Sequence, residues 1–532
     1  MDIKSPATTA VRRQGYVERL LRRRLADAPD AAWLTFKDET FSWRDALSMA
    51  RRAANGLLAA GVAPGDHVAL MAANKPDFIW IYFGLQLIGA RVVPLNSMQR
   101  GKALEHIVDD AQVSTIVLDP DLCEVILPLK QSCKSLVRCI NFGGTTAPGC
   151  DACYGDVMKA RDEDPPVGPA QAIAPVSIIY TSGTTGRPKG IVIEEDRFFY
   201  EDLAAACDLK PGETMYCCLP LFHGNGLYLS VLGSMYLDAK LLLAEKFSAS
   251  RFWEDCRRHD VRQINLLGSI VPILLNQPAS PEDARNPVRA ALSFGCPAVY
   301  WEAFQERFGV RVVECYSLSD SVGFMINRDG PVGSVGRPEH GMEFRVVDED
   351  DQDCTTGTVG EIVIRTPHGR ATTYKNMPEE TERAYRDGWF HTGDLGEVDA
   401  QGWFYFRGRK KEMIRRKGEN ISIWEIEAAF RDHPAVEEVA AFGVTADRAS
   451  AVEEEIMLAV VPKAGMRCDP AEVLAYGESR LARYAVPRYV EIVSALPKTA
   501  TEKVQRNLLS ERGTTQQTWD GADKTYVSRP AR

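Results

Sequence analysis

One stretch of the sequence is the most informative about the fold: Ile178-Ile179-Tyr180-Thr181-Ser182-Gly183-Thr184-Thr185-Gly186-Arg187-Pro188-Lys189-Gly190. It begins as an apolar, β-type run and continues into hydroxyl-bearing residues, glycines and one lysine. Glycines permit tight turns and the close approach of a ligand, and backbone N–H groups in such a loop can surround an anion. Lysine adds a point charge suited to phosphate. The stretch therefore predicts a phosphate-binding loop made by Thr181, Ser182, Gly183, Thr184, Thr185, Gly186 and Lys189.

Two other interpretations of this stretch fit less well. The nucleotide-triphosphate loop G-x-x-x-x-G-K-[ST] requires a wider glycine spacing and a lysine that directly follows glycine. A flexible Ser/Thr/Gly linker has no need for Pro188 and Lys189 directly before a second β-like run at residues 191–193. The whole string resembles the phosphate loop of the adenylate-forming superfamily, which comprises acyl-CoA synthetases, peptide-synthetase adenylation domains and luciferases.

Length and charge narrow the class of protein. A chain of 532 residues is too long for one compact core and predicts two or more domains. Its hydrophobic fraction of 45% and charged fraction of 26% are typical of soluble globular proteins. A formal net charge of -10 leaves no excess of basic residues to neutralise a phosphate backbone, so we expect no nucleic-acid partner.

Cysteine usage and hydropathy predict a cytoplasmic location. The 13 cysteines are scattered, and the C-x-x-C pair Cys150 and Cys153 lacks the second pair or histidines of a zinc site. Free thiols in a reducing compartment are the simpler expectation. The N-terminal residues lack the apolar core of a secretory signal. Residues 78–95 are interrupted by Gln86 and Arg91, and predict a buried helix followed by a strand rather than a membrane span.

Secondary-structure patterns predict an α/β fold. Strands alternate with helices over residues 68–316, which favours βαβ units and mostly parallel sheets. Near the N-terminus, residues 16–27 predict a basic surface helix, and Ser42 and Asp45 predict the capped start of another helix that runs to about Ala60.

Later patterns predict the domain division. Short alternating strands from about Gly341 predict a small barrel, and a compact α+β module follows Gly408. We therefore predict a large N-terminal domain, residues 1–408, with two doubly wound sheets and a small β-barrel. Residues 409–532 would form a small mobile α+β C-terminal domain, with a mobile polar tail after about Glu511.

Motifs that follow predicted strands occur in the order of the superfamily. Residues 219–226 lie where open α/β sheets bind ligands and resemble the acid-binding segment, which implies that His223 lies at the carboxylate pocket and takes part in catalysis. A lone histidine is more often structural. Residues 293–298 resemble the adenine-side loop, which implies that Gly295, Cys296 and Pro297 contact the nucleotide.

The segment Tyr316-Ser317-Leu318-Ser319-Asp320 resembles the motif aromatic-Gly-x-Thr-Glu. The resemblance implies that Tyr316 stacks on adenine, that Ser319 binds the α-phosphate during catalysis, and that Asp320 holds the Mg²⁺ of the triphosphate. Ser317 replaces a glycine beside the nucleotide. Aspartate keeps a hard oxygen ligand for Mg²⁺ but has a shorter reach than glutamate.

The remaining motifs lie towards the C-terminus. Residues 389–394 resemble the ribose-binding segment, which implies that Asp394 and Arg409 bind the ribose and that Lys411 is a hinge. Residues 416–422 resemble the loop that guides the pantetheine arm of CoA, at Gly418. Residues 497–504 resemble the catalytic-lysine motif, with Lys503 as the lysine and Glu502 where a glycine is common.

The resemblance covers residues 30–510 and implies an ATP-dependent carboxylic acid–CoA ligase that requires ATP, Mg²⁺ and CoA. The sequences around residues 416–422 and 501–505 look most like carnitine/crotonobetaine-CoA and alicyclic-acid-CoA ligases. Small residues near the expected pocket suggest a bulky or cyclic acid; they are Gly224, Gly226, Gly268, Ser269 and Gly323.

Three alternatives stay open at this stage. A stand-alone adenylation enzyme could load a carrier-protein thiol instead of CoA, although no feature of the sequence asks for a carrier protein. A luciferase-like oxygenase shares the fold. Outside enzymes, the altered segment 316–320 is compatible with a degenerate nucleotide-binding regulator.

Overall fold

The structure is a computed structural model that describes residues 15–166, 176–181, 188–194, 200–318, 321–339, 341–366, 373–410, 413–416, 419–445, 454–481, 485–499 and 502–527. The chain forms two compact units: the first is residues 1–342 with 365–388, and the second is residues 343–364 with 389–532. The strands predicted as a small barrel thus belong to the second unit. The boundary at Gly408 and a hinge beside it stay predictions.

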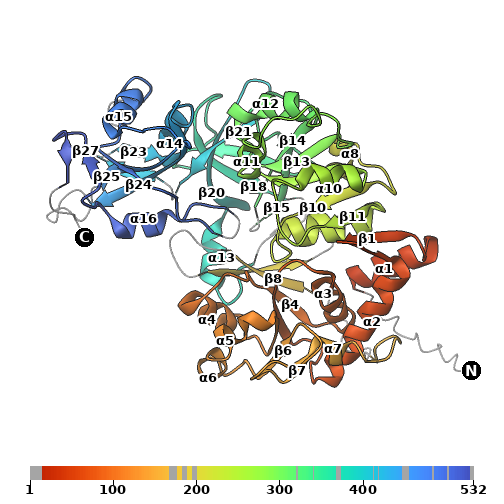
Figure 1. Cartoon of the computed structure of the whole chain (residues 1–532). Helices are drawn as coiled ribbons and strands as arrows, with labels where there is room; N and C mark the ends of the chain where they lie inside the picture. The colour runs from red at the N-terminus through yellow and green to blue at the C-terminus, as the bar shows by residue number, and fades with distance from the viewer. Residues whose placement is uncertain are drawn as a thin grey trace, which may run out of the picture. The chain divides into compact units, whose positions relative to one another are not determined.

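One sheet of the first unit carries the predicted phosphate loop. All of its neighbouring strands are parallel except the last pair, which is antiparallel. Val68 and Leu70 of one strand pack into one core, whereas Ala69 and Met71 pack into another, so both faces of this sheet are covered. In sheet order the strands are β7 (Ala152–Cys153), β6 (Arg138–Asn141), β5 (Thr115–Leu118), β3 (His67–Met71), β4 (Arg91–Pro94), β8 (Val176–Thr181) and β9 (Lys189–Glu194) (Figure 1).

The other sheet of the first unit has parallel strands in its centre and antiparallel strands at both edges. Its order is β16 (Arg337–Pro338), β15 (Ser321–Asn327), β14 (Arg311–Leu318), β13 (Ala290–Phe294), β12 (Val261–Leu267), β10 (Thr214–Cys217), β11 (Lys240–Leu243), β1 (Ala32–Phe36) and β2 (Glu39–Ser42). Parallel strands that alternate with helices confirm the predicted α/β class.

Helices cover these sheets. Ser42 and Asp45 form the predicted capping box at the start of their helix. The helices of the first unit are α1 (Tyr16–Asp27), α2 (Trp43–Ala59), α3 (Pro76–Ile88), α4 (Gly101–Asp110), η1 (Pro120–Leu122), α5 (Cys123–Ile126), α6 (Leu129–Ser132), α7 (Tyr154–Val157), α8 (Tyr200–Cys207), η3 (Asn225–Leu232, π-helical), α9 (Gly233–Leu237), α10 (Phe252–Arg258), α11 (Ile270–Leu275), α12 (Ala298–Phe308) and α13 (Pro378–Ala384); strand β19 is Tyr385–Arg386.

The second unit contains mostly antiparallel strands. They form a sheet with β17 (Glu343–Val347), β18 (Gly360–Arg365), β20 (Trp389–Val398) and β21 (Phe404–Arg409), a ribbon of β22 (Met413–Arg416) and β23 (Glu419–Ser422), and a sheet of β24 (Val436–Thr445), β25 (Glu454–Pro462), β26 (Tyr489–Ile492), β27 (Thr518–Asp520) and β28 (Thr525–Tyr526). Its helices are α14 (Ile423–Arg431), α15 (Pro470–Glu478) and α16 (Arg506–Arg512).

Helix α1 has the predicted bounds, residues 16–27, but its expected surface position and the expected mobile tail are both wrong. The basic helix α1 is not merely a surface element, because Val17 and Leu21 are fully buried and Arg24 donates a hydrogen bond to the Met235 carbonyl at 2.8 Å. The polar tail is ordered through β27 and β28, where Thr518 is fully buried and donates to Glu491 at 3.0 Å. In both cases polar side chains are satisfied by partners distant in sequence, which local composition does not reveal.

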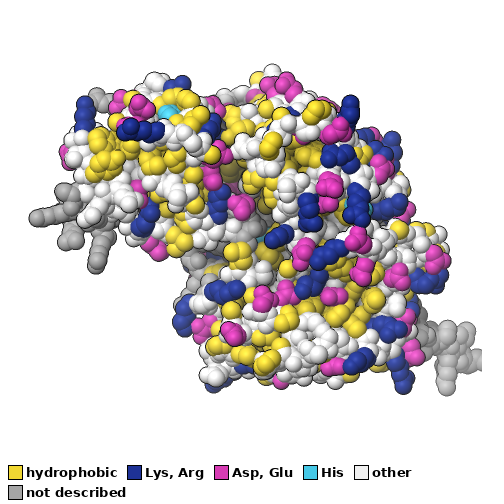
Figure 2. Space-filling view, viewed as in Figure 1, with side chains coloured by type: hydrophobic (Ala, Val, Ile, Leu, Met, Phe, Trp, Pro, Cys, Tyr) yellow, Lys and Arg dark blue, Asp and Glu magenta, His cyan; other side chains and the backbone are white. Residues whose placement is uncertain are grey.

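The apolar stretch that begins at residue 78 is buried, whereas charged side chains lie on the surface (Figure 2). Residues 78–88 are all of α3 except its first two residues, and residues 91–94 are strand β4, so the stretch is a helix followed by a strand, as predicted. Within the described residues, no helix is both long and apolar enough to cross a membrane. Basic and acidic side chains are interspersed on the face drawn in Figure 2.

Candidate functional site

The predicted phosphate loop joins two antiparallel strands. Strand β8 ends at Thr181 and β9 begins at Lys189, and these two residues pair across the hairpin. Ser182, Gly183, Thr184, Thr185 and Gly186 lie outside the described residues, as does the side chain of Thr181. The structure therefore places the two ends of the loop beside each other. The contacts within the loop stay predictions.

Lys189 makes an ion pair that the sequence analysis missed. Its Nζ lies 2.7 Å from Glu380 Oε2 of α13 and 4.9 Å from the centroid of the Tyr374 ring. Strand β9 also bridges to Tyr374 at Ile191, which brings the segment before α13 against the hairpin. The lysine is thus positioned by a carboxylate and an aromatic ring. A phosphate at this position would share the charge of Lys189 with Glu380.

His223 follows β10 and is held by backbone bonds. Its N–H donates to the Pro220 carbonyl at 3.1 Å, and its carbonyl accepts from the Leu227 N–H at 3.0 Å. Burial lowers the pKa of His223 to about 4, so the imidazole is neutral at pH 7. A neutral imidazole has one donor and one acceptor nitrogen. It can therefore donate a hydrogen bond to a carboxylate without carrying a charge.

Two of the small residues at the expected acid pocket are required by the backbone. A β-carbon at Gly226 would lie 2.4 Å from the Pro220 carbonyl oxygen, and one at Gly268 would lie 1.7 Å from the Gly295 carbonyl oxygen. Both contacts are too short for any side chain. These glycines therefore reflect close backbone packing, and they are no evidence of room for a bulky acid.

The adenine loop, which we define as Gly295, Cys296 and Pro297, follows the carboxyl end of β13. Gly295 has a φ of 83°, in the left-handed region that favours glycine. Pro297 directly precedes α12. The loop N–H groups donate to one carboxylate of the neighbouring strand β14: Gly295 to Glu314 Oε1 at 2.5 Å and Cys296 to Glu314 Oε2 at 3.1 Å. One buried side chain thus fixes the loop.

Glu314 is the main residue of this region that the sequence analysis missed. It is only 2% exposed, and burial raises its pKa to about 7 despite the hydrogen bonds it accepts. A signal was present, because Glu314 is a charged residue within the apolar run Val312-Val313-Glu314-Cys315. A carboxylate seldom occupies a buried strand unless donors face it.

Tyr316 lies two residues after Glu314, near the carboxyl end of β14. It is 7% exposed and pairs with Met325 of β15, and Ser317 pairs with Phe324. Ser319 and Asp320 lie outside the described residues. No set of three or more His, Cys, Asp or Glu side chains suited to a metal ion occurs among the residues that are described. The fit of Asp320 to Mg²⁺ stays a prediction.

In the second unit, the structure brings the two predicted ribose residues together. Asp394 of β20 and Arg409 of β21 pair across the ladder, and Arg409 Nε lies 3.0 Å from Asp394 Oδ1. Asp394 is only 2% exposed. Two residues that are 15 positions apart are therefore positioned side by side, as a shared ligand would require.

Glu361 of β18 contacts residues next to this pair, and the sequence analysis did not identify it. It accepts from the Gly393 N–H at 3.0 Å, and Lys410 Nζ lies 3.4 Å from its Oε2. Burial alone would raise the pKa of Glu361, but the hydrogen bonds from His391 and Gly393 and the charge of Lys410 lower it to about 2. Glu361 is therefore ionised and contacts Gly393, which precedes Asp394, and Lys410, which follows Arg409.

Lys503 lies on an exposed turn. The Thr499 N–H donates to the Lys503 carbonyl at 2.8 Å, and the Lys503 N–H donates to Thr499 Oγ1 at 3.2 Å. Glu502 has a φ of 60°, which explains why a glycine is common at this position in the superfamily. Lys411 and Gly418 lie outside the described residues.

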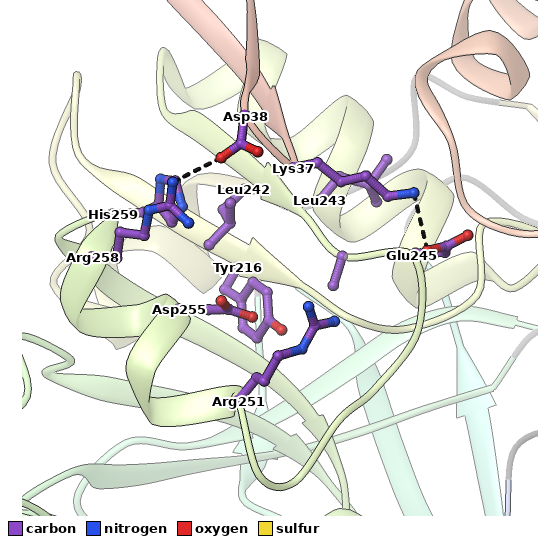
Figure 3. A pocket seen from close by; sticks show the side chains of 11 residues that line it. Lys37, Asp38, Tyr216, Leu242, Leu243, Glu245, Arg251, Asp255, Arg258 and His259 are labelled. Carbon is purple, nitrogen blue, oxygen red and sulfur yellow. Dashed lines mark hydrogen bonds and ion pairs between the residues drawn. The ribbon is translucent and has the colours of Figure 1, made fainter.

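A cavity of about 310 Å³ lies elsewhere in the first unit, at the carboxyl ends of β10 and β11 beside α10 (Figure 3). Ion pairs between Lys37 and Glu245 at 3.2 Å and between Arg258 and Asp38 at 2.7 Å line its rim. None of the predicted site residues lines this cavity. It is therefore separate from the candidate site.

Comparison with known proteins identifies the family. The model of the AMP-binding enzyme family matches residues 21–374, and that of the AMP-binding enzyme C-terminal domain matches residues 425–503. The chain is 31% identical over 501 residues to a sulfoacetate–CoA ligase of Cupriavidus necator, covering 92% of this chain and 96% of that protein. It is 29% identical over 483 residues to a crotonobetaine/carnitine–CoA ligase of Salmonella paratyphi B, covering 88% and 93%.

A solved structure shares the fold. The o-succinylbenzoate coenzyme A synthetase of Bacillus subtilis, determined with ATP and a magnesium ion, superposes with a TM-score of 0.77 at 25% identity, covering 92% of this chain and 98% of that one. Because the family models match residues 21–374 and 425–503 and the relatives align over about nine-tenths of the chain, the chain belongs to the AMP-binding enzyme family and is an AMP-forming acyl-CoA synthetase, a ligase.

Proposed function

We propose that this ligase joins a carboxylic acid to CoA in two half-reactions, with the site residues in the roles that follow. One observation carries the proposal. His223, the adenine loop and Tyr316 all lie at the carboxyl ends of β10, β13 and β14, within one sheet of the first unit. Open α/β sheets bind their ligands at this edge.

In the proposal, each part of the nucleotide has its own predicted binding residues. Tyr316 and the adenine loop hold adenine, with Ser317 beside it, and Asp394 and Arg409 bind the ribose hydroxyls. The loop from Thr181 to Gly186 and Lys189 bind the β- and γ-phosphates. Carboxylates can accept hydrogen bonds from two hydroxyls at once, which suits Asp394 to ribose.

The first half-reaction is an adenylyl transfer. The carboxylate oxygen of the acid attacks the α-phosphorus of ATP, pyrophosphate leaves, and an acyl-adenylate forms. Neutral His223 donates a hydrogen bond to the acid, Ser319 binds the α-phosphate, and Lys503 stabilises the negative charge that develops between them. Mg²⁺ bound to the triphosphate, with Asp320 as its protein ligand, would neutralise charge.

The second half-reaction is thioester formation. The CoA sulfur attacks the acyl carbonyl carbon, AMP leaves, and acyl-CoA forms. We propose that residues after the hinge at Lys411 turn between the two steps, which withdraws Lys503 and presents the Gly418 loop to the pantetheine arm.

A cytoplasmic location remains a prediction.

Two features near His223 bear on the chemistry of the acid. The earlier reason for a bulky or cyclic acid is weakened, because Gly226 and Gly268 are required by the backbone. Asn225, two residues after His223, has a buried side-chain oxygen without a hydrogen-bond partner within the described part of the chain. Such an oxygen favours an acid that carries a hydrogen-bond donor. The two curated relatives are named for sulfoacetate and for crotonobetaine and carnitine, small acids with a second charged group.

Acid-dependent exchange of labelled pyrophosphate into ATP tests the first half-reaction. The panel should contain acetate, a cyclic acid, its hydroxylated analogue, and small charged acids. We expect exchange with at least one acid, and a hydroxylated acid to exceed its unsubstituted analogue. Exchange with none of them, despite ATP binding, would favour the nucleotide-binding regulator.

Measurement of AMP release then tests whether CoA or a carrier-protein thiol accepts the acyl group. We expect CoA to increase AMP release strongly once an active acid is known. Release that depends on an added carrier protein, and is unaffected by CoA, would favour the stand-alone adenylation enzyme instead.

A further inference from the structure

Cys150 lies beside two thiols that are not part of its C-x-x-C motif. Its Sγ lies 3.4 Å from Cys123 Sγ and 3.3 Å from Cys139 Sγ. Cys153 Sγ instead donates to Asp156 Oδ2 at 3.3 Å. The thiols beside Cys150 therefore come from residues 27 and 11 positions earlier in the chain.

Backbone pairing brings this three-thiol cluster (Cys123, Cys139 and Cys150) together. Cys123 begins α5, Cys139 lies in β6, and Cys150 lies just before β7. The Asp151 N–H donates to the Cys139 carbonyl at 2.7 Å, and the Cys139 N–H donates to Asp151 Oδ2 at 2.7 Å. Cys150 is thus held against β6 by the residue that follows it.

The three thiols differ in access to solvent. Cys123 is 5% exposed and Cys139 is fully buried, whereas Cys150 is partly exposed. Burial raises the pKa of Cys123 to about 12 and the pKa values of Cys139 and Cys150 to about 11. An oxidant would therefore reach Cys150 first, and its reaction would be slow at neutral pH because little thiolate is present.

We propose that Cys150 is a redox-active thiol that forms an intramolecular disulfide with Cys139 or Cys123 when a low-molecular-weight disulfide oxidises it. The Cys150 thiolate attacks the oxidant, forms a mixed disulfide and releases one small thiolate. A neighbouring thiolate then attacks Cys150 Sγ, forms the protein disulfide and releases the second small thiolate. The two protein thiols lose two protons and two electrons, and the oxidant becomes two thiols.

The geometry requires little movement. A disulfide bond is about 2.05 Å long, so either sulfur pair must approach by somewhat more than about 1 Å. The third thiol can then attack the disulfide and exchange Cys139 for Cys123 without further oxidation.

Oxidation of the purified full-length chain tests the proposal. The reduced protein is incubated with oxidised glutathione and a metal chelator, blocked with iodoacetamide, digested without reductant, and mapped by mass spectrometry. We expect peptides that join Cys150 to Cys139 or to Cys123. The rate of their formation should rise about tenfold per pH unit between pH 7 and 9, because the thiolate fraction does.

Matched variants separate the cluster from the sequence motif. Cys150→Ser should remove both cross-links, whereas Cys153→Ser should leave them unchanged. The proposal is overturned if the wild-type chain forms a Cys150–Cys153 cross-link, or if Cys150 stops at the glutathione adduct. It is also overturned if no thiol of the cluster reacts.

Discussion

The adenine loop and the turn that carries Lys503 are held in different ways. In the loop, two N–H groups donate to the 2% exposed Glu314 of a neighbouring strand. In the turn, Thr499 and Lys503 bond to each other, and Lys503 is exposed. A distant carboxylate therefore positions the loop, whereas local backbone hydrogen bonds shape the turn, which an ion pair of Lys498 with Glu438 of β24 at 2.6 Å also anchors. A loop with a buried acceptor suits the binding of a rigid base, and an exposed turn suits a group that acts in one step only.

The largest expected effect concerns the turn. Lys503→Gln should lower the rate of acid-dependent pyrophosphate exchange about 100- to 1000-fold, as loss of one charge-stabilising donor does elsewhere. The affinity for ATP should change little, because in the proposal Lys503 acts on the developing charge. Timed assays of pyrophosphate–ATP exchange with the active acid measure this loss.

Lys524→Gln is the matched control for this prediction, because Lys524 is another exposed lysine of the second unit. Its exchange rate should equal that of the wild type. An active Lys503→Gln variant would contradict the assignment of the lysine.

The next effect concerns the loop. Glu314→Gln leaves one loop N–H without an acceptor, which costs about 1–3 kcal/mol. We expect KM for ATP to rise about 5- to 100-fold while kcat falls much less, because Glu314 positions the loop without touching the reacting atoms. Steady-state kinetics at varied ATP separate the two parameters.

Glu306→Gln, on the exposed side of α12, should leave both parameters unchanged. If Glu314→Gln reduced kcat and left KM for ATP as it was, the loop would not be a nucleotide-binding element.

The pH dependence of stability follows from Glu314 as well. Burial raises its pKa to about 7 in the folded protein, above the ordinary value of 4.5, so the folded state binds this proton more tightly than the unfolded state. The stability that this proton contributes is complete below pH 4.5 and is lost as the pH rises through about 7.

Urea unfolding at pH 5 and at pH 8 checks this direction. The wild-type chain should lose more stability than Glu314→Gln between the two pH values, because glutamine cannot ionise. Equal losses would mean that Glu314 does not titrate in this range.

The smallest expected effect is on the strain in the turn. Glu502→Gly should relieve the φ of 60° and stabilise the second unit by about 1 kcal/mol or less, offset in part by the lost contact with Lys498 at 3.3 Å. Glu502→Ala removes the same contact but keeps the strain, so it is the control. A variant with glycine that is no more stable than the one with alanine would show that the conformation is unstrained.

Local motifs were predicted well because their information lies in consecutive residues. Ser42 and Asp45 form the predicted capping box, and the two β-like runs on either side of the phosphate loop are strands β8 and β9. The same patterns misled where a partner lies far away. Gly226 and Gly268 resemble residues that leave room for a substrate, but each faces a backbone carbonyl.

From the sequence, residue types predicted a phosphate-binding loop, and the resemblance of the ordered motifs to the adenylate-forming superfamily implied the class of reaction, because both depend on residues in fixed succession. Only the tertiary structure decided which carboxylates hold the site: Glu314 for the adenine loop, Glu361 beside the ribose pair, and Glu380 on Lys189. It also decided that Cys150 lies beside Cys123 and Cys139. Sheet registers and helix packing bring these groups together, and neither is encoded in the spacing of neighbouring residues.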